Sequence, residues 1–303
     1  MNSTSAQSEQ FVSDSAREGT AGRISTVPRL FDWLLLLAAL GLAYGSTLVH
    51  VGETWWNEPD YSHGLFIPFL AVFFLWRKRK VLGSLPARPT PLGLVVVVGS
   101  QVIFLAGYLG AEFFLQEFSL LMFLAGLVLF VWGWGALWEV SFVLALLLLA
   151  IPLPAIIFNA VALPLQLIAS SWAESILRFC HVPVYREGNI LQLDRQMLNV
   201  TEACSGIRSL ASLITAGMVV GYFLPARRWL QVGFVLSTIP VALAANAARV
   251  AGTGLLGQHF GERWATGFFH LFSGWVIFVL AFGVLCVEFL LLQRWFGMRR
   301  SGA

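Results

Sequence analysis

Long apolar runs separated by short polar segments dominate this chain. Each run has about 15 to 25 residues, the length that a helix needs to cross about 30 Å of hydrocarbon. The runs lie at 30–50, 62–76, 92–110, 117–133, 137–153, 205–224, 229–250 and 268–292. The pattern predicts an all-α polytopic membrane protein with about eight transmembrane helices.

Composition excludes an ordinary soluble enzyme. Of the 303 residues, 58% are hydrophobic and only 12% are charged, far from the usual balance of a soluble domain. Many of the 12 Trp lie at the ends of apolar runs, among them Trp55, Trp56 and Trp132, as in the aromatic belts of membrane interfaces. Orientation in the bilayer accounts for most of the net charge of +3. We therefore expect membrane lipids as partners and no nucleic acid.

Basic residues predict the orientation. An even number of spans leaves both termini on one side, together with the basic clusters 77–80, 227–228 and 294–300. By the positive-inside rule this side is the cytoplasm, and the protein is predicted to be a multi-pass protein of the plasma membrane. The Lys and Arg residues expected outside are Arg178, Arg186, Arg195, Arg208, Arg249 and Arg263.

The chain divides into three parts. Residues 1–28 are polar and have no apolar periodicity, which predicts a disordered cytoplasmic tail. Residues 29–293 form the transmembrane domain, and residues 294–303 form a short basic cytoplasmic tail. The first apolar run lacks a basic n-region and a small-residue cleavage site, so we interpret it as a retained span and not as a signal peptide.

The segment 155–180 is long enough to span but carries several polar residues. If it crossed, the later spans would invert and Arg227 and Arg228 would face outward. We therefore predict an amphipathic helix at the outer interface. Residues 182–193 then alternate β-branched and polar positions around Gly188, which predicts a small extracytoplasmic β-hairpin.

Three polar residues stand at the predicted outer ends of the last three spans: Cys204, Arg249 and His270. Packed antiparallel helices bring such ends within about 10 Å. A helix N-terminus favours a thiolate, which makes Cys204 a candidate nucleophile. His270 would accept the thiol proton and return it to a leaving amine, and Arg249 would stabilise the tetrahedral oxygen.

Further polar residues have candidate supporting roles. Asn246 lies one turn before Arg249 and would orient it or the substrate backbone, whereas Glu202 and Ser205 flank Cys204. Arg186, Arg208 and Arg263 are candidates to pair with a substrate carboxylate. Arg208 has a second interpretation, in which it braces the Cys204 segment. His63, near Asp60 and Tyr61, is a second candidate acid or base, and we expect a supporting role for it.

Each residue also has a structural interpretation. Arg249 could extend to lipid headgroups, and His270 could be an interfacial hydrogen-bonding residue. We interpret Cys180 and Cys286 as packing residues, although a disulfide between Cys180 and Cys204 remains open. The three cysteines show no metal-like spacing, so the sequence predicts no metal site and no cofactor.

The sequence resembles the exosortases, polytopic bacterial cysteine transpeptidases related to the archaeosortases. The resemblance covers roughly residues 30–292 and is carried by these segments: Glu202-Ala203-Cys204-Ser205-Gly206-Ile207-Arg208, Asn246-x-x-Arg249, His270 with Gly274, Tyr61-Ser62-His63-Gly64 with Pro68, Pro152-Leu153-Pro154 with Gln166, and Arg186-Glu187-Gly188. It implies Cys204, Arg249 and His270 as catalytic residues.

The resemblance also implies a substrate class. Exosortase substrates are secreted proteins that end in a short motif such as Pro-Glu-Pro, a transmembrane helix and a basic tail. The expected reaction is cleavage near that motif at the outer membrane face, through a thioester, followed by transfer to an acceptor. Exopolysaccharide machinery is a possible partner.

Two other functions compete. A lipid or polysaccharide transporter would carry ionisable residues near mid-bilayer and broken helices in paired halves. Here the ionisable residues cluster at span ends, with Glu139 and Glu288 as exceptions close to such ends. A thiol oxidoreductase would need a resolving cysteine in a Cys-x-x-Cys motif, and the sequence has none.

Overall fold

The computed structural model describes residues 30–194, 196–200, 207–261 and 268–300. Most of them are helical, and a small sheet lies between α7 and α8 in the chain, which confirms the predicted all-α membrane fold with a small β element. The elements are α2 (Leu30–Asn57), η1 (Pro59–Phe66), α3 (Ile67–Ser84), α4 (Pro91–Leu109), α5 (Phe113–Val131), α6 (Trp134–Leu149), α7 (Ala155–Phe179), β1 (Val184–Glu187), β2 (Ile190–Leu193), β3 (Met197–Asn199), α8 (Ile207–Tyr222), α9 (Arg228–Phe260) and α11 (Phe268–Arg300).

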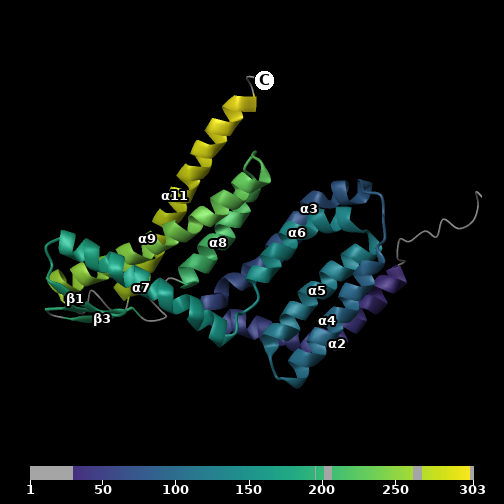
Figure 1. Ribbon diagram of the computed structural model, residues 1–303, viewed down its shortest axis with the longest axis horizontal. Helices are drawn as coiled ribbons and strands as arrows, with labels where there is room; N and C mark the ends of the chain where they lie inside the picture. The colour runs from purple at the N-terminus through teal and green to yellow at the C-terminus, as the bar shows by residue number, and fades with distance from the viewer. Residues whose placement is uncertain (1–29, 195, 201–206, 262–267, 301–303) are drawn as a thin grey trace, which may run out of the picture.

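The helices form two groups that lie side by side (Figure 1). The first group holds α2 to α6, and the second holds α8, α9 and α11. Within the first group α4 and α5 form a closely packed hairpin. Gly93 of α4 lies so near the backbone of Phe130 of α5 that a Cβ at this position would collide with it. The two groups meet where Met218, Val219 and Tyr222 of α8 pack against the buried core of α3 and α6.

Basic residues gather at one end of the bundle. Lys78 of α3 forms an ion pair with Glu139 of α6 at 2.9 Å. The guanidinium of Arg77 lies 5.2 Å from the ring centroid of Phe223 at the end of α8. These contacts bring the end of α3, the start of α6 and the end of α8 together, as the predicted order of spans requires. Glu139 is therefore paired with a cation within the protein.

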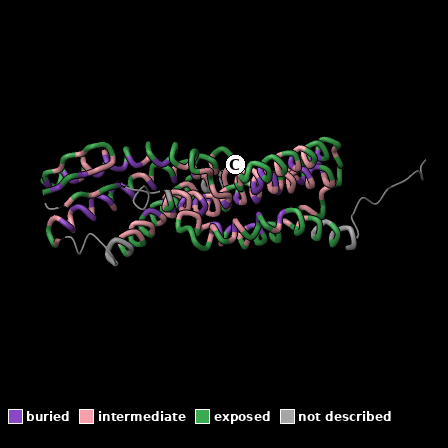
Figure 2. Tube along the Cα trace, turned by 90° about the horizontal axis from the view of Figure 1, so that it is seen from below, coloured by how far each residue is buried: buried purple, intermediate pink, exposed green. Residues whose placement is uncertain are grey.

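The outer faces of the helices carry large apolar side chains, and Figure 2 shows exposed residues along them. Among the described helices, five are long and apolar enough to cross a membrane: α4, α5, α7, α9 and the part 272–296 of α11. The predicted count of eight is therefore not established. The helix α7 is among the five by length and composition, yet in Figure 1 it runs across the ends of α8 and α9 and not along them.

A small sheet lies beside α7 at the end of the bundle opposite to the basic residues (Figure 1). The strands β1 and β2 pair antiparallel with Glu187 opposite Ile190, which confirms the predicted hairpin. Gly188 begins the turn with φ 63°, a conformation that glycine adopts at little cost. The sequence analysis missed β3, a short strand that pairs with β2.

The sheet and α7 share one core with α9. Leu177 of α7, Leu191 of β2 and Val250 of α9 are buried in it together with Val200. On the same surface of α9, Gly257 packs so closely on the Gln196 side chain that a Cβ would collide with it. The Gln196 amide donates to the Gly254 carbonyl at 2.9 Å.

This packing corrects one prediction. We expected Arg249 at the end of the helix that carries it, but α9 continues to Phe260. The interpretation treated a charged residue as a helix end, whereas the last turns of α9 are stabilised by burial against α7 and the sheet. Arg249 therefore lies about three turns before the end of α9.

Candidate active site

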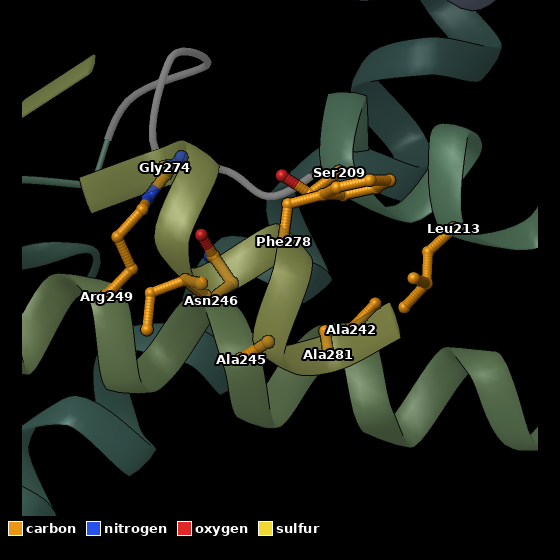
Figure 3. Close-up of a pocket in the computed structure, with 10 residues that line it drawn as sticks. Ser209, Leu213, Ala242, Ala245, Asn246, Arg249, Gly274, Phe278 and Ala281 are labelled. Atoms are coloured by element: carbon orange, nitrogen blue, oxygen red, sulfur yellow. The ribbon is translucent and has the colours of Figure 1, made fainter. Parts of the chain in front are cut away.

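A pocket opens between α8, α9 and α11, with an empty volume of about 270 Å³ that includes its open mouth. Its polar lining residues and one glycine are Ser209, Asn246, Arg249 and Gly274. The other lining residues are apolar: Leu213, Ala242, Ala245, Ile277, Phe278 and Ala281. Figure 3 shows the side chains of Arg249 and Asn246 extending from α9 toward Gly274 of α11.

Gly274 of α11 lies beside the guanidinium of Arg249. A Cβ at Gly274 would stand 3.5 Å from Arg249 Nη1, which is ordinary van der Waals contact. A larger side chain at this position would occupy the space of the guanidinium. Gly274 is thus the position where α11 approaches Arg249.

Asn246 lies in the interior beside Arg249. Its side chain is 4% exposed, and it lines the same pocket one turn earlier on α9. The structure thus brings together two of the predicted site residues, Asn246 and Arg249. A buried amide and a guanidinium at one pocket can hold a peptide carbonyl or a developing oxyanion.

The predicted nucleophile lies outside the described residues, together with Glu202 and Ser205. Cys204 precedes α8, which begins at Ile207 and contributes Ser209 to the pocket. His270 belongs to the first turn of α11, four residues before Gly274, and its side chain is not described. Ser209 near the start of α8 and Gly274 near the start of α11 line the same pocket as Arg249, while the catalytic contacts stay a prediction.

The chain that enters the Cys204 segment is held by Asn189 and Gln166. Asn189 Nδ2 donates to the Val200 carbonyl at 3.1 Å and to Gln166 Oε1 at 3.2 Å. The Val200 amide donates back to the Asn189 carbonyl at 2.9 Å. Gln166 is 8% exposed and Val200 is 1% exposed. The last described residue before the Cys204 segment is therefore fixed on both of its backbone polar groups.

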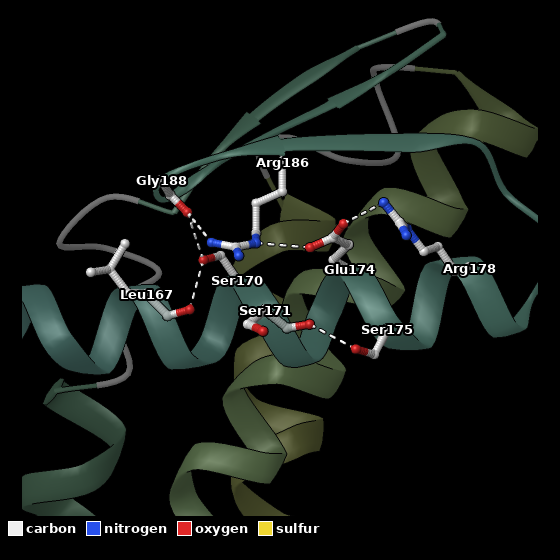
Figure 4. A network of polar contacts seen from close by, with 8 residues as sticks. All are labelled: Leu167, Ser170, Ser171, Glu174, Ser175, Arg178, Arg186 and Gly188. Atoms are coloured by element: carbon white, nitrogen blue, oxygen red, sulfur yellow. Dashed lines mark hydrogen bonds and ion pairs between the residues drawn. The ribbon is translucent and has the colours of Figure 1, made fainter.

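A polar network fastens the sheet to α7 (Figure 4). Glu174 of α7 accepts from Arg186 Nε at 2.8 Å on one oxygen and pairs with Arg178 at 2.7 Å on the other. Ser170 donates to the Gly188 carbonyl at 3.1 Å. Arg186 thus has a partner within the protein, which favours a bracing role over recognition of a substrate carboxylate.

The chain that leaves the Cys204 segment is held by Arg208. Its Nε donates to Asp60 Oδ1 of η1 at 3.1 Å. This ion pair links the first group of helices to the start of α8, four residues after Cys204. It favours the bracing interpretation of Arg208. The third candidate for a substrate carboxylate, Arg263, lies outside the described residues.

Reversing the charges of this pair tests the bracing role. We expect Asp60→Arg and Arg208→Asp each to lower substrate turnover by about tenfold, because a small displacement of a catalytic group is costly. Stability should change by less than about 1 kcal/mol, since the pair is partly exposed. The combined exchange should recover most of the turnover, measured as initial cleavage rates in isolated membranes. A double variant no better than either single one would refute the role.

His63 lies at the end of α6 and not in the pocket. Three side chains of α2 and η1 donate to carbonyls there: Trp55 Nε1 to Ala150 at 2.8 Å, His63 Nε2 to Leu149 at 3.2 Å, and the Tyr61 hydroxyl to Leu153 at 3.4 Å. The last carbonyls of a helix have no partner within it. His63 therefore completes the end of α6, which agrees with a supporting role.

Burial lowers the pKa of His63, although its hydrogen bond to the Leu149 carbonyl acts in the opposite direction. The folded protein thus keeps His63 neutral under conditions where the unfolded chain, with an ordinary pKa of about 6.5, takes up a proton. Stability from this residue is complete above about pH 6.5 and falls as the pH drops below that value.

Two results should follow for His63. Exchange to Ala should lower turnover less than the exchange His270→Ala, and an equal or larger loss would reverse the assignment of the base. Exchange to Gln should reduce the loss of thermal stability between pH 6.5 and pH 5, because Gln does not titrate. Melting curves of the detergent-solubilised protein at both values measure this, and an unchanged loss would contradict it.

Sequence analysis missed several residues that shape this region. Asn189 and Asp60 were seen only as parts of a turn and a polar segment, and their roles arise from contacts across long stretches of chain. Glu117, the first residue of the apolar run 117–133, was not singled out; it is 6% exposed in α5, and neither carboxylate oxygen has a hydrogen-bond partner among the described residues.

Cysteines and metal ligands complete the survey. Cys180 is exposed at the end of α7, which corrects its interpretation as a packing residue, and Cys286 is half-buried. Both are free thiols. In the parts of the chain that the structure describes, no three His, Cys, Asp or Glu residues lie together in a way that would hold a metal ion.

Comparison with known proteins gives one finding. A family model described as transmembrane exosortase matches residues 55–287. This range includes the pocket, the sheet, η1 and the positions of Cys204, Arg249 and His270. Searches among curated proteins and among solved structures gave no match.

Proposed function

Because the chain belongs to the transmembrane exosortase family, we propose that it is a membrane cysteine transpeptidase that acts at the outer face of the bacterial plasma membrane. Family membership supports the transpeptidase role in general. The substrates would be secreted proteins whose C-terminal sorting signal consists of a Pro-Glu-Pro-type motif, a transmembrane helix and a basic tail. Both termini of the enzyme would lie in the cytoplasm with the basic end of the bundle.

One observation carries this proposal. The guanidinium of Arg249 lies beside Gly274, at a pocket bordered by α8 and α11. Cys204 shortly precedes α8, and His270 lies in the first turn of α11. A nucleophile shortly before one helix, a base in the first turn of a second and a cation on a third helix packed with them are the groups that acyl transfer needs.

The proposed reaction has two halves. His270 takes the proton of the Cys204 thiol, and the sulfur attacks the carbonyl carbon of the scissile peptide. Arg249 stabilises the negative charge on the tetrahedral oxygen, with Asn246 as its orienting neighbour. The C–N bond then breaks, His270 protonates the leaving amine, and a thioester remains on Cys204. An acceptor nucleophile displaces the thiolate and takes over the secreted protein.

The surroundings of the Cys204 segment support the need for precise placement. Asn189 holds Val200 before the segment, and Asp60 holds Arg208 after it. Fixed residues on both sides of a nucleophile reduce the conformational entropy that substrate binding costs. The interior position of Asn246 limits its own motion in the same way.

The transporter alternative finds less support. Inside the first group of helices, buried polar side chains bond to one another: Tyr44 with Ser119 at 3.1 Å and Thr47 with Gln116 at 3.0 Å. On the opposite side of the molecule, Ser237 of α9 donates to Glu288 of α11 at 2.8 Å. These bonds hold helices together, whereas a transport path needs polar groups that a substrate can reach.

Cleavage of a reporter tests the proposed function. The reporter is a secreted protein that ends in Pro-Glu-Pro, an apolar helix and a basic tail, expressed in the same cells as the enzyme. We expect the wild type to produce a shorter reporter, seen as a mobility shift. A reporter whose Pro-Glu-Pro is replaced by Ala-Ala-Ala should stay intact. Equal cleavage of both reporters, or of neither, would contradict the proposed substrate class.

A further inference from the structure

Basic residues gather where the two groups of helices meet. Four of them belong to two short stretches of chain, one on α3 and one at the start of α9: Arg77, Lys78, Arg227 and Arg228. Phe223, which directly follows α8, lies against the first stretch, since the guanidinium of Arg77 is 5.2 Å from its ring centroid. Only the short connection 223–227 separates α8 from α9. The turn that carries the second stretch therefore packs on the first.

Helix α6 receives a contact from each stretch. Lys78 pairs with Glu139 at 2.9 Å, and the guanidinium of Arg228 lies 4.2 Å from the ring centroid of Trp138. Since Trp138 and Glu139 are neighbours in the chain, both stretches meet at the same turn of α6. We call this place, where the four cations gather around α6, the basic junction. It lies at the end of the bundle that is predicted to be cytoplasmic.

The basic junction has an excess of positive charge. Among the residues that the structure describes, Glu139 is the only carboxylate paired with one of the four cations, and its partner is Lys78. The other three, Arg77, Arg227 and Arg228, are exposed. Helix α9 begins here without a capping bond from a described side chain, and the start of a helix favours anions. Because cations gathered in one place repel one another, the junction favours an anionic ligand.

Large apolar side chains flank the exposed arginines. Phe223 is 42% exposed, Trp138 is 61% exposed and Trp229 is 65% exposed. A small soluble anion would use the charges alone and leave these rings uncovered. A phospholipid would place its phosphate on the guanidinium groups and its acyl chains along the rings, and basic sites between transmembrane helices bind acidic headgroups in this way. The junction thus matches an acidic phospholipid better than a free anion.

We propose that the basic junction binds the headgroup of an acidic phospholipid. Its phosphate accepts hydrogen bonds from Arg77, Arg227 and Arg228, and its acyl chains lie along the exposed rings. One lipid bound in this way joins α3 of the first group to α9 of the second and offsets the repulsion between their cations. A zwitterionic lipid brings a cation of its own to the junction and binds more weakly. The proposal is independent of the proposed function, because it involves neither Cys204 nor the pocket.

Native mass spectrometry of the full chain, purified in detergent, tests the choice of lipid. The probes are phosphatidylglycerol and phosphatidylcholine with the same acyl chains. We expect bound phosphatidylglycerol to exceed bound phosphatidylcholine by at least about fivefold. Equal binding of the two lipids would overturn the proposal. Displacement of phosphatidylglycerol by inorganic phosphate at an equal concentration would also overturn it, because the junction would then be a site for a free anion.

Arg79 provides the matched control for Arg228. Both are exposed, and each guanidinium lies 4.2 Å from the ring centroid of a tryptophan, Trp76 for Arg79 and Trp138 for Arg228. Arg79 belongs to another face of α3 than Arg77, because two helical residues are about 200° apart. Arg228→Gln and Arg77→Gln should each lower phosphatidylglycerol binding by about fivefold, and Arg79→Gln should leave it unchanged. Equal losses in all three variants would refute the junction as the site.

Thermal unfolding in detergent with added lipid gives a second measurement. Phosphatidylglycerol should raise the melting temperature of the wild type by at least about 3 °C relative to phosphatidylcholine, because a ligand that binds the folded state stabilises it. Arg228→Lys keeps the charge and should keep most of this shift, whereas Arg228→Gln should lose most of it. A full shift in Arg228→Gln, or in Arg77→Gln if the first variant fails to fold, would contradict the proposal.

Discussion

Exchange of Cys204 for Ala is expected to abolish cleavage of the Pro-Glu-Pro reporter, with a loss of at least about a thousandfold, as for the nucleophile of an acyl-transfer enzyme. The reason is chemical, because no other group in the proposed reaction can form the acyl intermediate. Cys204→Ser should also be inactive or nearly so, since a hydroxyl is a far weaker nucleophile than a thiolate at neutral pH. The measurement is the mobility shift at equal membrane levels of each variant.

Cys180 provides the matched control for Cys204. It is a free, exposed thiol at the end of α7, so Cys180→Ala should leave both turnover and membrane level unchanged. Full activity in Cys204→Ala would refute the nucleophile and bring the transporter alternative forward. Loss of activity in Cys180→Ala at an equal membrane level would contradict the assignment of Cys204 as the cysteine that the reaction needs.

Exchange of Arg249 for Ala should lower cleavage by about a hundred- to a thousandfold, the usual cost of losing one donor to the tetrahedral oxygen. Arg249→Lys should restore little, because a flexible ammonium does not reproduce the fixed geometry of a guanidinium. Most of the loss should appear in kcat, since the interaction forms with the charge that develops in the reaction. Reporter cleavage at several substrate levels in membranes measures this.

Two substitutions of Gly274 form a matched pair that tests the position of Arg249 in the reaction. In Gly274→Ala the added methyl would stand 3.5 Å from Arg249 Nη1, an ordinary contact, so activity should stay within about twofold of the wild type. Gly274→Leu should displace the guanidinium and reduce activity nearly as far as Arg249→Ala. Wild-type activity in both Gly274 variants would contradict the position of Arg249 in the reaction.

Much of this fold could be predicted from the sequence because its helices are marked by composition. Most helix ends lie within a few residues of the ends of the predicted apolar runs. The turn at Gly188 was predicted from the alternation of β-branched and polar residues around that glycine. The ends of helices that leave the membrane were harder. The last turns of α9 pack on α7 and the sheet, and no local pattern marks a helix that is stabilised by contacts so distant in the chain.

The residue types of the candidate site could be predicted from the sequence, but the hydrogen bonds and ion pairs that hold the surrounding chain could not. The sequence predicted a cysteine, an arginine and a histidine at successive outer span ends. Arg249 instead lies within α9, and the structure brings it to α11 next to Gly274. The bonds from Asn189 to Val200 and from Arg208 to Asp60 join residues that the sequence separates widely, 148 positions in the second case. Such supports depend on the packing of the whole chain.

Detection of the covalent intermediate tests the central claim most directly. Purified enzyme is mixed with the Pro-Glu-Pro reporter, quenched in acid and analysed by mass spectrometry after digestion. The account predicts that the secreted part of the reporter is attached to the peptide that contains Cys204, and that hydroxylamine releases it as a hydroxamate, as expected of a thioester. Attachment to another residue, or a bond that resists hydroxylamine, would contradict the account.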